Sequence, residues 1–179
     1  LTLGVLLMTA VGASIQLLSV STLRPMRSLM ACRLLSWLLI PGVGILVYGM
    51  MNLSSLALVI GGSLVTIALL IYALLVFDNL VFASGMGVIT AYIWAAILSL
   101  CMIVALGIAL IMDYYHAFLQ DHTFTAVTHM LLAAYGFMGM LSLGFSYILI
   151  PMFALAAFQN KKLAHTGFIL NVIALLLLV

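Results

Sequence analysis

Long apolar runs are the feature that most constrains this chain. The stretch from Val88 to Met112 contains no charged residue, and similar stretches fill most of the sequence. A transmembrane α-helix needs about 20 mainly apolar residues to cross the hydrocarbon core of a bilayer. A membrane β-barrel would instead show polar residues alternating along every strand, and these runs lack that pattern. We therefore predict an all-α fold, a polytopic transmembrane helical bundle.

Polar residues divide the chain into about six expected spans. The segment from Val88 is the fourth of these spans, and the fifth begins near Thr123. We expect Pro41 to kink the second span, the Asp78-Asn79 pair to close the third, and Pro151 to stop the fifth. The expected spans cover residues 1–20, 34–51, 56–77, 88–112, 123–150 and the residues from 163 onward.

The whole chain, residues 1–179, is expected to form a single transmembrane helical domain. It opens on Leu1 within one apolar run and stops within another. We therefore expect it to be a fragment of a longer protein.

The composition excludes several other functional classes. Apolar residues make up 68% of the chain and charged residues 4%, with a mean hydropathy of +1.47. Five basic residues are too few for a phosphate-binding track, and the two cysteines lack the CxxC spacing of zinc ribbons. The expected partners are the lipid bilayer and other membrane subunits or a redox partner, and not nucleic acid.

The basic residues predict an orientation. Lys and Arg are retained on the cytoplasmic side of membrane proteins. With six spans, the first and fifth loops share one face, and these loops hold or adjoin every basic residue. Asp113 and Asp121 belong to the fourth loop, on the opposite face. We therefore expect five residues at the cytoplasmic end: Arg24, Arg27, Arg33, Lys161 and Lys162.

His129 is the residue that the sequence marks most clearly as a candidate ligand. It lies about seven residues into the fifth span, roughly 10 Å below the outer end at 1.5 Å per residue. An ionisable residue at such a depth is costly and tends to be functional. Ala133, Gly136 and Met140 follow it along one helix face. Two small residues beneath a histidine leave a gap beside the backbone, which could admit a haem bound through the imidazole.

This pattern has a second interpretation that the sequence leaves open. Small residues such as Ala133, Gly136 and Gly139 also form close-packing helix faces in membranes. His129 would then only hydrogen-bond to a neighbouring helix. An ion or proton pathway is a third interpretation.

The remaining histidines lie near the ends of spans. His116 and His122 accompany Asp113 and Asp121 around the outer loop, and these residue types suit a divalent metal. The alternative is a solvated loop whose aspartate caps the next helix. His122 and His129 share a face but lie about 10 Å apart along the axis, too far apart to bind one metal together. The candidate metal ligands are His129, His122 and His116.

Two segments resemble a known family. LTLGVLLMTAVGASIQLLSV at 1–20 and HMLLAAYGFMGMLSLGFSYILIPMF at 129–153 resemble helices of subunit I of the haem-copper oxidases, including the NnrS-like branch. In that family the second motif begins at a histidine, often in a His-x-His pair. His129 matches that histidine, while Val127 stands where the pair would be completed.

The resemblance implies that His129 binds haem b and that the chain acts in electron transfer or in handling a diatomic gas. It does not carry over a copper site, because the extra histidines are missing from these residues. We therefore expect a membrane haem-binding protein of a respiratory chain, in a bacterial inner membrane. The alternatives are a cofactor-free structural or assembly subunit of a respiratory or metal-handling complex, and a transporter with a helix break at Pro41-Gly42.

Overall fold

A helical bundle forms the whole of the described structure. The computed structural model describes residues 2–83, 87–155 and 160–178, and no strand occurs among them. Six of the helices there are long and apolar enough to cross a membrane. The predicted all-α transmembrane bundle is therefore confirmed. In chain order the elements are η1 (Thr2–Leu7), α1 (Met8–Ser21), α2 (Leu29–Asn52), α3 (Ser55–Val81), α4 (Val88–His116), α5 (His122–Leu131), η2 (Leu132–Gly139), α6 (Met140–Ala154) and α7 (Lys161–Leu178).

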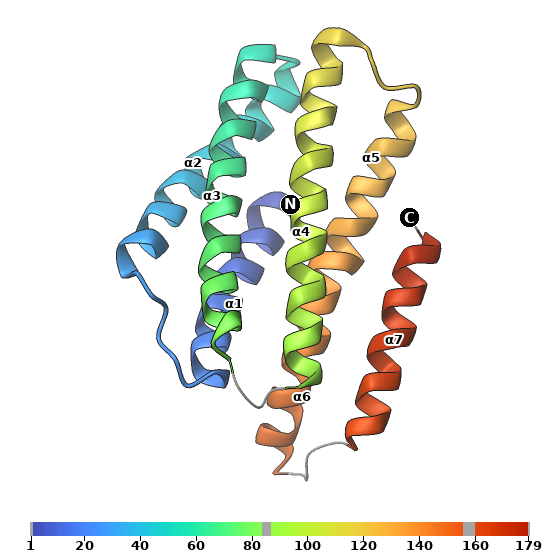
Figure 1. The fold of residues 1–179 in the computed structure, drawn as a ribbon. Coiled ribbons are helices and arrows are strands. Elements are labelled where there is room, and N and C mark those ends of the chain that lie inside the picture. Colours follow the sequence, from blue (N-terminus) through green and yellow to red (C-terminus); the bar gives the residue numbers. More distant parts are fainter. Residues whose placement is uncertain (1, 84–86, 156–159, 179) are drawn as a thin grey trace.

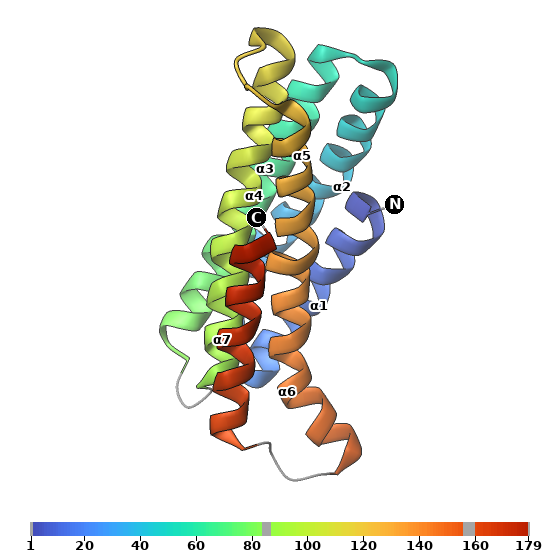
Figure 2. The ribbon, with the colours of Figure 1, turned by 90° about the vertical axis from the view of Figure 1, so that its right-hand side faces the viewer.

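Helix α4 occupies the middle of the bundle. It contacts α3 on one side and α5, η2, α6 and α7 on the other (Figure 1). The view turned by 90° shows α5, η2 and α6 following one another as a nearly continuous rod beside α4 (Figure 2). The rod therefore packs along the length of α4.

The two ends of the bundle differ in charge, as the loop positions predict. α1, α3 and α6 end at the same end of the bundle, where α4 and α7 begin, whereas α2 begins partway along the bundle (Figure 1). The segment after α1 and the start of α7 carry Arg24, Arg27 and Lys161 there, whereas Asp113 and Asp121 lie at the opposite end. These positions agree with the predicted separation of charge, but Arg33 lies in α2, which begins partway along the bundle. Exposure of the basic end to the cytoplasm stays a prediction.

The third span is longer than the sequence predicts, because its polar residues find partners. We expected Asp78-Asn79 to close this span, but α3 continues to Val81. The Asp78 carboxylate accepts from the Arg27 guanidinium at 3.1 Å, and Asn79 Nδ2 donates to the Arg24 carbonyl oxygen at 3.1 Å. The polar pair therefore anchors the segment after α1 without ending the helix.

The two membrane prolines also leave their helices intact. We expected Pro151 to stop the fifth span, but α6 continues through it to Ala154 and ends at Leu155, whose φ is +50°. A proline inside a helix removes one backbone hydrogen bond and does not prevent the following residues from remaining helical. Helix α2 likewise runs through Pro41.

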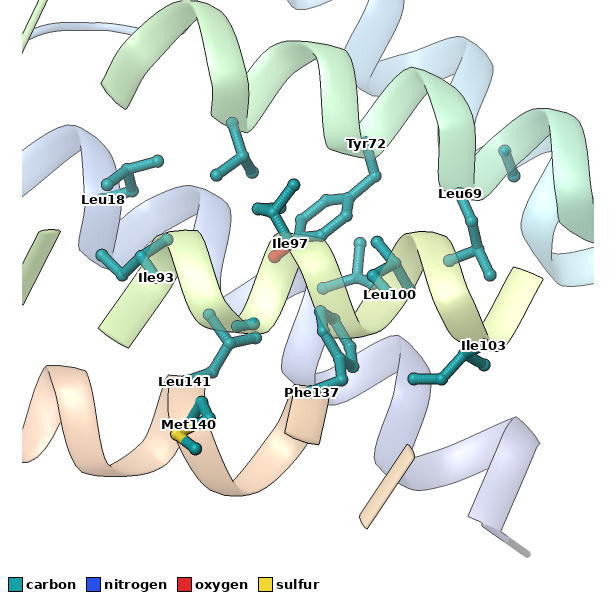
Figure 3. Packing of buried hydrophobic residues seen from close by; sticks show 14 of the residues in the cluster. Leu18, Leu69, Tyr72, Ile93, Ile97, Leu100, Ile103, Phe137, Met140 and Leu141 are labelled. Carbon is teal, nitrogen blue, oxygen red and sulfur yellow. The ribbon is translucent and has the colours of Figure 1, made fainter. Parts of the chain in front are cut away.

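The core lies where α1, α3, α4 and η2 converge (Figure 3). Tyr72 of α3 packs edge-on against Phe137 of η2, with ring centroids 6.0 Å apart. Ser14 of α1 donates to the Val11 carbonyl, so the Tyr72 hydroxyl donates to Ser14 Oγ at 2.7 Å. This buried bond connects α1 with α3 inside the membrane.

The segment η2 has a wider turn than an α-helix. It is π-helical, with hydrogen bonds from residue i to i+5, and such turns are frequent at functional sites. The neighbours Gly136 and Phe137 are both buried. The period of 3.6 residues used to predict the face below His129 therefore does not hold through this segment.

Candidate functional site

At the end of the bundle that carries the acidic loop, an aspartate of α4 is bonded to a histidine of α5. His122 Nδ1 lies 2.7 Å from Asp113 Oδ2, and the backbone N–H of Leu119 donates to Asp113 Oδ1 at 2.7 Å. An ionised carboxylate only accepts hydrogen bonds, so Nδ1 carries the proton in this pair. The Asp113 side chain is only 10% exposed, whereas His122 is 50% exposed. Asp113 thus fixes both the loop and the ring of His122.

Asp121 has a separate and purely local function. Its Oδ1 accepts from the backbone N–H of Phe124 at 2.9 Å, at the start of α5. A side-chain acceptor at this position satisfies one of the free N–H groups of the first helical turn. The helix cap weighed in the sequence analysis is therefore confirmed for Asp121.

His129 lies deeper along the same contact between α4 and α5. Its ring rests against Gly107 of α4, where an added Cβ would lie 3.2 Å from His129 Cε1 and 3.8 Å from Nδ1. The side chain is half-buried, and Nδ1 is buried without a hydrogen bond. The site therefore holds a polar atom without a hydrogen bond, on a ring that a larger residue at position 107 would displace.

The residues predicted below His129 lie in the contact with α4. Gly136 faces Ser99, and an added Cβ on this glycine would lie 2.7 Å from Ser99 Oγ and 3.4 Å from Leu175 Cδ2 of α7. Met140 is 2% exposed, and Ala133 packs partly buried against the core. Side chains of α4 and α7 thus fill the space beside Gly136. This is the close helix packing that the sequence left open as an alternative.

The three histidines predicted as metal ligands do not come together. His116 ends α4 as an exposed residue beside Tyr115, while His122 pairs with Asp113 and His129 packs against Gly107. Among the described residues, no group of three or more His, Cys, Asp or Glu side chains could hold a metal ion. Each histidine must therefore be considered alone or with ligands from outside the described residues.

His165 belongs to the opposite end of the bundle, as expected. Its Nδ1 lies 2.8 Å from the Lys161 carbonyl oxygen in the first turn of α7, and its side chain is exposed. It therefore provides a natural control for His129, since the two histidines lie in different surroundings.

Gly107 is the site residue that sequence reasoning missed. It is one of 14 glycines, and nothing in its own neighbourhood separates it from the others. Its relation to His129 depends on how α4 and α5 pack. A pattern along one helix carries no such information.

A cavity of about 370 Å³ lies elsewhere, between α1 and α6. It is mainly apolar, with the hydroxyls of Ser14, Ser142 and Ser146 in its wall. His129 is not among its lining residues. The cavity and the histidine are therefore separate features of the bundle.

No protein-family model, curated protein or solved structure matches this chain.

Proposed function

We propose that the chain is a membrane haem-binding protein of the oxidase-subunit-I-like group, with His129 as one axial ligand of a haem b. The observation that carries the proposal is the half-buried imidazole within the fifth span, which makes no hydrogen bond among the described residues. Polar groups inside a membrane are costly unless they have a partner. The resemblance of residues 129–153 to a motif that begins at a haem-binding histidine also supports the proposal.

The residues around His129 fit the role of an imidazole ligand. Gly107 leaves room for the ring against α4, and α4 limits the directions in which the ring can turn. A histidine that binds iron through one nitrogen usually has the other nitrogen oriented by a nearby acceptor. Haem supplies one-electron chemistry when it is bound. The chain's own part is to hold the ring in place and keep water away from it.

The packing beside Gly136 limits where the haem ring could lie. Gly136 faces Ser99 of α4, and both Gly136 and Met140 are buried. A haem that extended over Gly136 would have to displace Ser99 and Leu175. A haem held by His129 would therefore have to avoid the space beside Gly136, and its second ligand would come from another helix.

The proposal includes a location and partners. The protein would act in a bacterial inner membrane, in electron transfer or in handling a diatomic gas, and would contact other membrane subunits or a redox partner. The six apolar helices support the membrane part of this statement.

A second candidate is a cofactor-free structural or assembly subunit of a membrane complex. The close packing of Gly136 against Ser99 favours it, because the small residue then has a structural purpose. His129 would in that case be a packed histidine without a ligand.

A reduced-minus-oxidised absorption spectrum of the purified protein distinguishes the two candidates. The haem proposal predicts a Soret band that His129→Ala abolishes or shifts, while His165→Ala leaves it intact. A parent protein that contains no haem, or a band that survives in both variants, would refute ligation by His129. The structural-subunit function would then take its place.

A further inference from the structure

We propose that Gly107 is a positioning residue for His129. It turns the Nδ1 edge of the imidazole toward α4 and leaves Nε2 as the nitrogen that is open to a ligand. The orientation of the ring follows from contacts within the chain. Only the identity of the ligand, a haem iron, rests on the proposed function.

The contact distances define which edge of the ring faces α4. From the point where a Gly107 Cβ would stand, Cε1 is 3.2 Å away and Nδ1 is 3.8 Å away, whereas Nε2 lies beyond 4 Å. Separations of 3.2 Å are tighter than almost all real Cβ contacts. Any residue other than glycine would therefore push the ring away from its present position.

The burial of Nδ1 agrees with this orientation. Nδ1 is buried and makes no hydrogen bond, and it lies on the ring edge that faces Gly107 of α4. A neutral imidazole has one donor nitrogen and one acceptor nitrogen. Backbone carbonyls can only accept, so we expect the proton on Nδ1, the nitrogen on the edge that faces α4. The lone pair of Nε2 then remains for a ligand.

His122 repeats the same orientation one step further out. Its Nδ1 is held by Asp113 of α4 at 2.7 Å, so its Nε2 is also the free nitrogen. Asp113 and Gly107 are six residues apart on α4, and the two histidines are seven apart on the antiparallel α5. Both rings therefore turn their Nδ1 edge toward α4. His122 meets the carboxylate of Asp113 near the end of the helix, and His129 meets the backbone at Gly107 within the membrane.

The first test measures the tautomer of His129 without any cofactor. We would label the histidines with ¹⁵N and record solid-state NMR spectra of the protein in lipid vesicles at alkaline pH. His129→Gln identifies the signals by their loss. We expect a protonated Nδ1 and an unprotonated Nε2 at His129. The opposite tautomer, with the proton on Nε2, would overturn the proposal.

The second test changes the glycine. Gly107→Ala should shift both nitrogen signals of His129 or produce a mixture of tautomers, because the new Cβ displaces Cε1. Gly12→Ala is the matched control, since an added Cβ there meets nothing within 4 Å. Unchanged His129 signals in Gly107→Ala would overturn the positioning role. The parent spectrum tests the orientation even if this variant folds poorly.

Asp113→Asn adds a check that the effect is specific to the site. It should change the His122 signals and leave those of His129 in place, because His122 is the histidine to which the carboxylate is bonded. Equal changes at both histidines would mean that α4 moves as a whole. This result would overturn the proposal that Gly107 positions His129 independently of the Asp113–His122 pair.

Haem titration separates this inference from the proposed function. If haem binds the parent, Gly107→Ala should shift the Soret maximum or the reduction potential, and Gly12→Ala should not. If no haem binds but the tautomer is as expected, the positioning by Gly107 stands and the proposed function fails.

Discussion

The α2–α3 pair and the contact of α4 with α5 and η2 both place glycines between helices, but the glycines meet different atoms. Gly61 of α3 faces backbone, and an added Cβ would lie 2.6 Å from Leu46 Cα of α2. Gly107 faces the His129 ring, and Gly136 faces the Ser99 side chain. Backbone cannot move aside, whereas a side chain can rotate or be replaced. The first contact is therefore rigid, and the second can be adjusted.

The two contacts also differ in polarity: the α2–α3 contact is apolar, and the contact of α4 with α5 and η2 contains polar side chains. In the α2–α3 pair, Gly42 meets Leu64 and Gly49 meets the Ala57-Leu58 backbone. Helix α4 instead meets a histidine on α5 and supplies a serine to η2. Small residues let membrane helices approach closely in both cases. Only the second contact holds a group that could bind something else.

The largest effect is expected at Gly61. Gly61→Ala places a methyl group onto the α2 backbone, so the helices must separate along their length. We expect a loss of stability at or above the upper end of the roughly 1–3 kcal/mol typical of overpacking. Unfolding by SDS in mixed micelles would measure it. Gly44→Ala on α2 is the control, because its Cβ meets nothing within 4 Å. Equal stability of the two variants would contradict a backbone contact.

A smaller effect is expected at Gly136, and it should be recoverable. Gly136→Ala brings a methyl group 2.7 Å from Ser99 Oγ, at a cost of about 1–3 kcal/mol. The additional change Ser99→Gly should restore part of that stability, because the obstacle is a side chain. No such second change exists for Gly61. Parent-like stability of Gly136→Leu would show that this face contacts lipid and would remove the basis of the comparison.

The smallest effect is expected for the buried hydroxyl pair that connects α1 with α3. Tyr72→Phe removes the donor to Ser14 Oγ and keeps the ring packing with Phe137. Hydrogen bonds between membrane helices contribute about 0.6 kcal/mol on average. A double-mutant cycle with Ser14→Ala should give a coupling of this order. Zero coupling would mean that ring packing alone holds α1 against α3.

Much of the fold follows from the sequence, because apolar length decides which segments span a membrane. The six spans and the separation of charge between the two ends could be predicted in this way. The ends of spans were less predictable. Asp78 and Pro151 are residue types that often end a helix. Asp78 instead pairs with Arg27, and α6 continues through Pro151.

The site could be predicted only in part. His129 is visible in the sequence because a histidine within a span is unusual. Gly107 is not, because its effect depends on a neighbour on another helix. The face through Gly136 also crosses the π-helical η2, whose wider turn no residue pattern indicated.

The close α2–α3 pair has a consequence for how the protein is made. The two helices are joined by only Leu53 and Ser54, and the atoms nearest to an added Cβ at Gly42, Gly49 and Gly61 all belong to this pair of helices. Chains emerge from the ribosome with the N-terminal part first. The hairpin can therefore enter the membrane and close on itself before α4 has been synthesised. It then presents a finished surface on which the histidine-bearing half of the protein assembles.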